Sequence, residues 1–141
     1  MSLEDEVRKA SQQFYSGLTR MANGHKESMT DVWSHSKTVS TMHPIGGRQL
    51  GWDSVKDSFE QVAQLATEGK VELKNQLIRV IGDMACEIGT EQGQFKLNGE
   101  QISINQRVTN IYQRENNEWK IIHHHADLSQ VMIDVLSRLP A

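Results

Sequence analysis

Residues 119–127 read Trp-Lys-Ile-Ile-His-His-His-Ala-Asp, a β-like run that leads into three consecutive histidines. In a strand, alternation sends the odd-numbered residues from Trp119 to His125 to one face and the even-numbered ones to the other. We therefore expect His123 and His125 to face the interior with Trp119, and His124 to lie outside. A histidine on the inner face is either a hydrogen-bonded core residue or part of a pocket wall.

This run is the last of four with strand character. The four cover residues 71–81, 84–92, 101–113 and 118–126. Between them stand Gly82-Asp83, Asn98-Gly99 and Asn116-Asn117, which are residue types that tolerate the positive φ of tight hairpin turns. Four sequential strands with such turns predict an antiparallel meander.

Helices are predicted before and after the meander in the sequence. Apolar residues spaced three and four apart predict an N-terminal helix over residues 3–21, a helix over 51–69, and a C-terminal helix from Leu128 that Pro140 ends. A short helix is expected near residues 29–33. Residues 36–43 are rich in Thr, Val and Ser and predict a strand that stops before Pro44, with Gly46-Gly47 in a loop.

The order of these elements predicts an α+β fold in a single domain over residues 1–141. A curved, mostly antiparallel sheet must wrap around the N-terminal helices. The C-terminal helix must bury its apolar stripe on the domain or on a partner subunit. A strongly bent sheet cannot fill its open end with side chains, so we expect a cone-shaped pocket there.

The composition narrows the class of protein. A formal net charge of −3 gives no basic field, so neither nucleic acid nor an anionic membrane surface is an expected partner. No apolar run approaches the length of a membrane span, and the N-terminus is acidic, unlike a signal peptide. The single cysteine, Cys86, cannot form an internal disulfide, which fits a reducing compartment. We expect a cytoplasmic protein.

Two histidines are the leading candidates for chemistry. His43 stands at a predicted strand end directly before Pro44, and a neutral imidazole there suits a general base near neutral pH. His125 is the second candidate, and His43, His123 and His125 together could also ligate a transition metal. Because no carboxylate or cysteine stands at a characteristic ligand spacing, we predict no metal site.

Aromatic residues accompany these histidines. Tyr15 lies beside the apolar face of the N-terminal helix and could turn its hydroxyl into the pocket. Trp33 and Trp52 flank the strand that ends at His43 and suggest an aromatic-lined cavity for a flat or apolar ligand. The sequence shows no Gly-rich phosphate loop, no Ser-His-Asp order and no pair of carboxylates in an apolar context. Nucleotide binding, serine hydrolysis and a bound cofactor are therefore not expected.

Several stretches together resemble one family. They are Asp-Val-Trp-Ser-His at 31–35, Met-His-Pro-Ile-Gly-Gly at 42–47, Gly51-Trp52, and Trp-x-Ile-x-x-x-His-x-Asp at 119–127. With the order of elements, they are similar over nearly the whole chain to the SnoaL-like, ketosteroid-isomerase-like branch of the NTF2-like superfamily. The resemblance implies a cone-shaped α+β barrel, usually a homodimer. This fold hosts isomerases, dehydratases, hydrolases and binding modules, so it constrains the activity weakly.

The resemblance also implies roles for single residues. In ketosteroid isomerases an aspartate directly before a proline is the base, and His43 stands at that position here. Tyr15 matches a helix tyrosine that binds the substrate oxygen, while no aspartate occurs between Gln101 and Gln113 to supply the second donor. Asn110 or another donor would have to replace it, so steroid isomerase activity of the usual kind is not expected.

These observations predict a small-molecule-binding protein with a pocket for a largely apolar organic ligand. The expected chemistry is a cofactor-independent isomerase or lyase reaction, with His43 as base and His125 orienting a carbonyl oxygen. Further ligand contacts are expected from Trp33, Trp52, His123, Asn110 and Trp119. The alternative is a non-catalytic binding or oligomerisation module that resembles the association domain of calmodulin-dependent kinase. A homodimer is expected in the first case.

Overall fold

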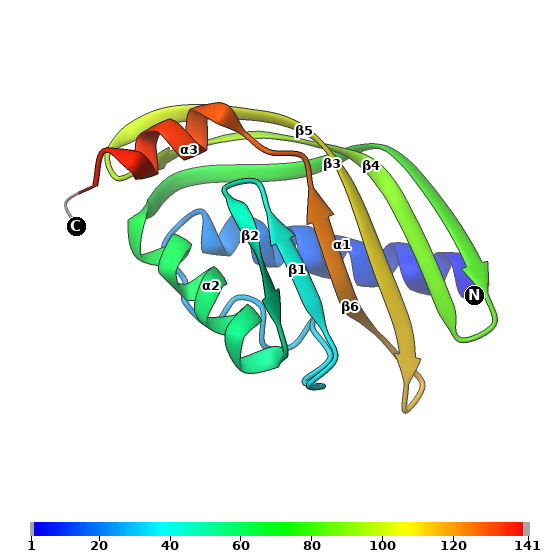
Figure 1. Ribbon diagram of the computed structural model, residues 1–141. Coiled ribbons are helices and arrows are strands. Elements are labelled where there is room, and N and C mark those ends of the chain that lie inside the picture. The colour runs from blue at the N-terminus through cyan, green and yellow to red at the C-terminus, as the bar shows by residue number, and fades with distance from the viewer. Residues whose placement is uncertain (1, 140–141) are drawn as a thin grey trace.

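A curved six-stranded sheet and the helices on its concave side form the molecule (Figure 1). The computed structural model describes residues 2–139. Within these residues the helices are α1 (Leu3–Met21), α2 (Trp52–Leu65) and α3 (Gln130–Ser137). The strands are β1 (Ser40–His43), β2 (Gly46–Leu50), β3 (Ala66–Ile81), β4 (Met84–Leu97), β5 (Glu100–Glu115) and β6 (Glu118–Ala126).

The sheet has the strand order β2-β1-β6-β5-β4-β3. Strands β3 to β6 form the predicted antiparallel meander, and β1 joins it through a parallel pairing with β6. The turns hold Gly82, Asn98, Gly99, Asn116 and Asn117 at positive φ, as their residue types predict. With β2 and β3 as its two edges, the sheet is curved but unclosed, and the predicted cone-shaped α+β fold is confirmed.

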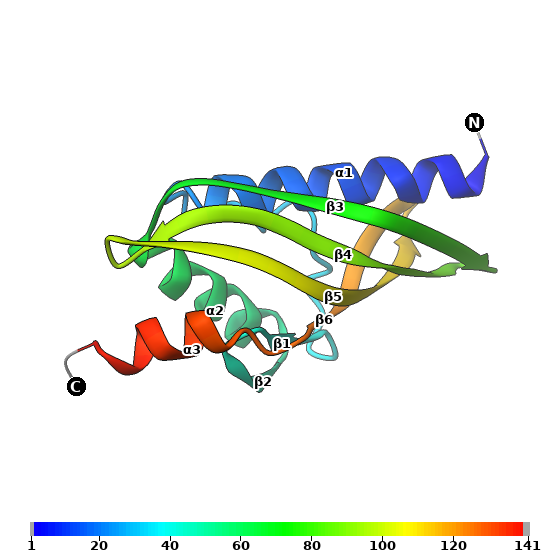
Figure 2. The same cartoon turned by 90° about the horizontal axis from the view of Figure 1, so that it is seen from above.

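Helix α1 supports the concave side of the sheet along the length of β3 (Figure 2). The Ser2 hydroxyl caps its N-terminus by accepting a hydrogen bond from the Asp5 amide at 3.1 Å. Acidic residues fill the first turn, where they oppose the helix dipole. Its buried face includes Val7, Phe14 and Leu18, so the predicted apolar stripe forms the floor of the core.

Several boundaries differ from the sequence predictions, including the start of β3 at Ala66 instead of residue 71 and the end of β4 at Leu97 instead of residue 92. The strand predicted over residues 36–43 is only β1, and Gly46-Gly47 opens a second strand because φ values of 97° and 81° close a tight hairpin. Residues 29–32 form turns and Trp33 makes an isolated parallel bridge to Ile121, so the predicted short helix is absent there. Helix α2 ends at Leu65, and Gly69 lies inside β3, where its missing side chain lets the strand approach α1 closely. A Cβ there would lie 2.5 Å from the Cβ atoms of Ala22 and Phe95.

Helix α3 is shorter than predicted. The Ser129 hydroxyl accepts a hydrogen bond from the Met132 amide at 3.4 Å and starts the helix. Met132 and Val135 are buried, and Leu128 and Val131 remain exposed. Pro140, predicted to end the helix, lies outside the described residues. No helix in the described part of the chain is long and apolar enough to cross a membrane.

Candidate functional site

A β-bulge in β6 decides which histidine faces the interior. Adjacent residues of β5 pair with Ile121 and with His123, which leaves Ile122 as the extra residue. The bulge reverses the alternation, so Ile121 faces the core before it and His124 faces the core after it. His124 is 2% exposed, and His125 is exposed on the outer face. The prediction that His123 and His125 point inward and His124 outward is wrong, because strict alternation allows for no extra residue.

A cavity of about 50 Å³, called the inner cavity here, lies between the sheet and the three helices. Its polar lining consists of His43, Glu91, Gln106 and His124, which come from four different strands. The remaining lining is apolar: Leu18, Met21, Pro44, Ile45, Phe59, Val62, Val71, Phe95, Ile104 and Met132. A few convergent polar groups on an apolar wall are typical of a ligand site.

Glu91 is a carboxyl held inside the protein at 2% exposure. The Tyr15 hydroxyl donates to its Oε2 at 2.9 Å, and Gln106 Nε2 donates to its Oε1 at 2.9 Å. Burial raises the pKa of Glu91 to about 7, although these two donors favour the ionised form. Glu91 therefore changes its charge close to neutral pH.

A chain of hydrogen bonds links Glu91 to a second buried carboxyl. Asn110 Nδ2 donates to the Tyr15 hydroxyl at 2.9 Å and to Glu87 Oε1 at 3.0 Å. Asn110 Oδ1 lies 2.6 Å from His124 Nδ1. The other ring nitrogen, His124 Nε2, lies 3.9 Å from Glu91 Oε2. Burial lowers the pKa of His124 well below its usual value, so the ring is neutral near pH 7.

His43 points inward from β1 and is 6% exposed. Its Nε2 lies 2.7 Å from the Ser58 hydroxyl, and Phe59 packs its ring edge-on at 4.8 Å. Burial lowers the pKa of His43 to about 4. The imidazole is therefore neutral across the pH range in which most proteins work.

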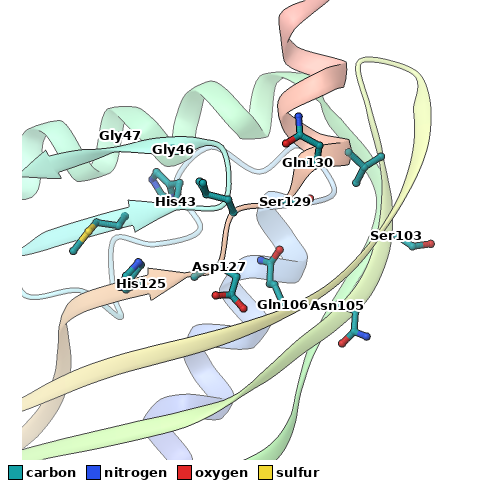
Figure 3. A pocket seen from close by; sticks show the side chains of 14 residues that line it. His43, Gly46, Gly47, Ser103, Asn105, Gln106, His125, Asp127, Ser129 and Gln130 are labelled. Carbon is teal, nitrogen blue, oxygen red and sulfur yellow. The ribbon is translucent and has the colours of Figure 1, made fainter.

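A wider space, called the outer groove here, opens beside the inner cavity with a volume of about 880 Å³. Figure 3 shows His43 beside the Gly46-Gly47 turn, His125 at the end of β6, and Gln106 on β5. His43 and Gln106 line both the groove and the cavity. These two side chains therefore stand where the two spaces meet, and the structure brings His43 and His125 to one groove.

The tryptophans lie away from both spaces. Trp33 is 1% exposed in the core, with Phe59 and Phe14 as ring neighbours. Trp52 stacks on His35 with ring centroids 4.4 Å apart. Trp119 is buried near the hairpin that starts β6.

The remaining predicted site residues fall into two groups. Tyr15 and Asn110 reach the inner cavity through the hydrogen bonds that connect them to Glu91 and His124. His123 lies on the outer side of the sheet, where its Nδ1 is 2.7 Å from the Ser40 hydroxyl.

Among residues 2–139, no group of three or more His, Cys, Asp or Glu side chains is placed to hold a metal ion.

Sequence reasoning missed Glu87 and Glu91. The prediction that there is no pair of carboxylates in an apolar context is wrong, because both side chains are buried on the concave face of β4. The signal is the phase of the strand, because odd-numbered residues from Ala85 to Leu97 include Phe95 and face the core. Glu87 and Glu91 share that phase.

A family comparison agrees with this geometry. A model of the SnoaL-like domain matches residues 7–133, so the chain belongs to the SnoaL-like family, and the resemblance found in the sequence is confirmed. A comparison with curated proteins found no match.

Solved structures of NTF2-like proteins share the fold. A protein from Streptomyces avermitilis, provisionally named a dehydratase of the NTF2-like family, is 23% identical with a TM-score of 0.78, covering 89% of this chain and 95% of that one. A protein from Novosphingobium aromaticivorans, provisionally named an aromatic ring hydroxylase, is 16% identical with a TM-score of 0.76, covering 89% and 87%.

A third neighbour belongs to a different functional class. A protein from Thiobacillus denitrificans, provisionally named a calcium/calmodulin-dependent protein kinase type II association domain, is 22% identical with a TM-score of 0.70, covering 86% of this chain and 93% of that one. At these identities the three likenesses establish the fold and leave the activity open.

Proposed function

We propose that the chain binds a small, largely apolar organic molecule where the inner cavity meets the outer groove. We further propose that His43 acts there as the general base of a cofactor-independent isomerase or lyase. The observation that carries the proposal is the position of His43, a buried neutral imidazole that lines both spaces. The apolar walls supply binding free energy through burial of the ligand, and the polar groups orient it.

The hydrogen bonds of His43 make it available as a base. The Ser58 hydroxyl donates to the Val55 carbonyl oxygen at 2.6 Å, so it must accept its bond from His43 Nε2–H. Nδ1 then carries the lone pair and makes no hydrogen bond within the described residues. A pKa of about 4 also makes the ring a weak base, so the proton it removes must be acidified by an electron-withdrawing neighbour in the ligand.

The cavity gives little support to a carbonyl substrate of the steroid-isomerase type. The Tyr15 hydroxyl donates to Glu91, and Asn110 Nδ2 donates to Tyr15 and Glu87. Neither donor is left for a substrate oxygen, and His125 faces the outer groove. The reaction class left by this donor set is a proton transfer that needs no oxyanion hole.

The two spaces differ in size and should hold different parts of the ligand. An inner cavity of about 50 Å³ holds a few heavy atoms, whereas the outer groove of about 880 Å³ holds a larger group. We infer that the reacting end enters past His43 and Gln106 while the rest of the ligand occupies the groove.

The test combines ligand-observed NMR screening of small organic molecules with turnover of each hit, followed by the appearance of new alkene protons. Replacing His43 with Ala should abolish turnover, and replacing the exposed His35 with Ala serves as the matched control. Retained turnover in His43→Ala with an unchanged pH profile would contradict the assignment of His43 as the general base. A screen without any saturable binder would sink the binding proposal.

A second candidate function is self-association, and the outer face of the sheet favours it. Leu77, Ile81, Met84 and Ile88 are exposed there on β3 and β4, next to the exposed Cys86. Contiguous apolar side chains on a sheet face mark a protein contact surface. We propose that a second copy covers this face in a homodimer.

Sedimentation of the wild type and of Ile88→Asp tests this second candidate. The wild type should sediment as a dimer and the variant as a monomer, with exposed Gln92→Asp as the matched control. A monomeric wild type at micromolar concentration would contradict the proposal, and a larger ring would point to an assembly of the association-domain kind.

We also propose a cytoplasmic location, in keeping with the single unpaired cysteine, which cell fractionation would check.

A further inference from the structure

The side chains that line the inner cavity leave mainly hydrogen-bond acceptors without partners. Gln106 Nε2 donates one of its two N–H bonds to Glu91, and Gln106 Oε1 is buried without a hydrogen-bond partner among the described residues. The Gln106 amide cannot flip, because a flip would place its oxygen against the carboxyl oxygen of Glu91. An unpaired buried acceptor costs free energy unless a ligand or water donates to it.

His124 presents a second acceptor. Asn110 Nδ2 faces the Glu87 carboxylate, so Asn110 Oδ1 must be the atom that faces His124. An amide oxygen only accepts, and therefore His124 Nδ1 carries the ring proton. The neutral ring then carries its lone pair on Nε2, the atom that lies 3.9 Å from Glu91 Oε2.

His43 presents a third acceptor by the same reasoning. Its Nε2–H is donated to Ser58, which leaves the lone pair on Nδ1. Glu91 adds a carboxyl whose two donors come from Tyr15 and Gln106. The lining of the cavity contains no lysine or arginine, and Glu87 lies behind it in the same hydrogen-bond network.

We propose that the inner cavity receives the ammonium group of a small primary amine. An ammonium group carries three N–H donors and no acceptor, which matches a cluster of acceptors around an ionisable carboxyl. A ketone or a carboxylate would set its oxygen atoms against the lone pairs of Gln106, His124 and His43. This inference rests on the proposed function for the place of the ligand and adds the chemistry of its head group.

The hydrocarbon part of such an amine also matches the wall of the cavity. The apolar side chains of Phe59, Phe95 and Met132 line the same cavity and would cover the hydrocarbon part. The ammonium nitrogen and the carbon that bears it are about what a space of about 50 Å³ can hold, so the rest of the amine extends towards the outer groove.

The binding should depend on pH through Glu91. The titratable groups that face it are Tyr15 on α1, Glu87 on β4, Tyr112 on β5, His124 on β6 and His43 on β1. Helices α2 and α3 and strand β3 contribute only apolar side chains to the cavity lining. Below about pH 7 a proton on Glu91 competes with the ammonium group, so amine affinity should rise about tenfold per pH unit up to that point and then level off.

The experiment is an NMR titration with four probes of equal heavy-atom count: isopropylammonium, isopropanol, acetone and acetate. It follows the imidazole resonances of His43 and His124 in the full chain at several pH values. Isopropylammonium should saturate these shifts and bind at least about tenfold more tightly than isopropanol at pH 8. Glu91→Gln should weaken amine binding and remove its pH dependence, whereas Glu118→Gln, which alters an exposed side chain, should change neither.

The outcomes separate this inference from the proposed function. If acetone, acetate or isopropanol saturates the shifts at least as tightly as the amine, the cavity is a binding site and the ammonium inference is overturned. If amine affinity does not change with pH in the wild type, the role of Glu91 is overturned. If none of the four probes saturates the shifts, both the inference and the proposed binding at this cavity fail.

Discussion

Replacing Glu91 with Gln should change the stability of the protein by an amount that increases with pH. Glutamine removes the charge, and its amide nitrogen replaces one of the two oxygens that accept hydrogen bonds from Tyr15 and Gln106. The pKa of Glu91 rises from an ordinary 4.5 to about 7 on folding, which corresponds to a cost of about 3 kcal/mol for the ionised form in the folded state. Glu91 is fully buried, so no allowance for solvent screening is needed.

The sign of the effect follows from the two protonation states. Below about pH 4.5 Glu91 is protonated in both the folded and the unfolded chain, and the wild type pays no penalty for its charge. Between about pH 4.5 and 7 only the unfolded chain is ionised, so wild-type stability falls as pH rises. Above about pH 7 both states are ionised and the full cost of about 3 kcal/mol remains.

The difference between variant and wild type is the quantity to measure, because His43 acts in the opposite direction. Its pKa falls from 6.5 to about 4 on folding, so its contribution to stability is present above about pH 6.5 and is lost as pH falls through about 4. The two slopes oppose each other in the wild type. Subtracting the wild-type curve from the Glu91→Gln curve cancels the His43 contribution.

Urea unfolding at a series of pH values supplies both curves. The free energy of unfolding of Glu91→Gln minus that of the wild type should rise by about 3 kcal/mol between about pH 4.5 and 7.5. Glu118→Gln, at an exposed position, should give a difference that does not change with pH. A constant difference for Glu91→Gln would refute the claim that this carboxyl is buried with a raised pKa.

Three further perturbations test separate parts of the structure. Gly69→Ala should destabilise the fold by about 1–3 kcal/mol in urea unfolding, because its Cβ would lie 2.5 Å from the Cβ atoms of neighbouring residues in α1's C-terminal cap and β4; an unchanged midpoint would contradict the close approach. Tyr15→Phe should raise the pKa of Glu91 further, as followed by carboxyl carbon NMR, because the Tyr15 hydroxyl favours the ionised form. Asp127→Asn should leave the unfolding midpoint unchanged, since the ion pair with Arg107 is open to solvent, and a clear loss of stability would count against that view.

Much of the fold could be predicted from the sequence because its signals are local. Asn98-Gly99 and Asn116-Asn117 mark hairpin turns by their tolerance of positive φ, and the apolar spacing of residues 3–21 marks α1. Gly69 misled the prediction, since a glycine that ends a helix and one that allows close packing look alike in sequence. Only the contact with Ala22 and Phe95 separates the two cases.

The candidate site was harder to predict because it depends on contacts between distant residues. His43 was identified from its place before Pro44, and it lies at the cavity. Whether His124 or His125 faces the core depends on the β-bulge at Ile122, and no local sequence pattern predicts that bulge. Glu91 could have been found from the phase of β4, but its partners Tyr15 and Gln106 come from elements far away in the sequence.

The most direct test of the central claim is a crystal structure of the protein soaked with isopropylammonium at about pH 8, above the pKa of Glu91. The amine nitrogen should lie within hydrogen-bond distance of Glu91 and of at least one of His124 and Gln106, with the methyl groups against Phe59 and Phe95. An inner cavity without the amine, in a crystal that binds it elsewhere on the surface, would contradict the proposal that this cavity receives an ammonium group.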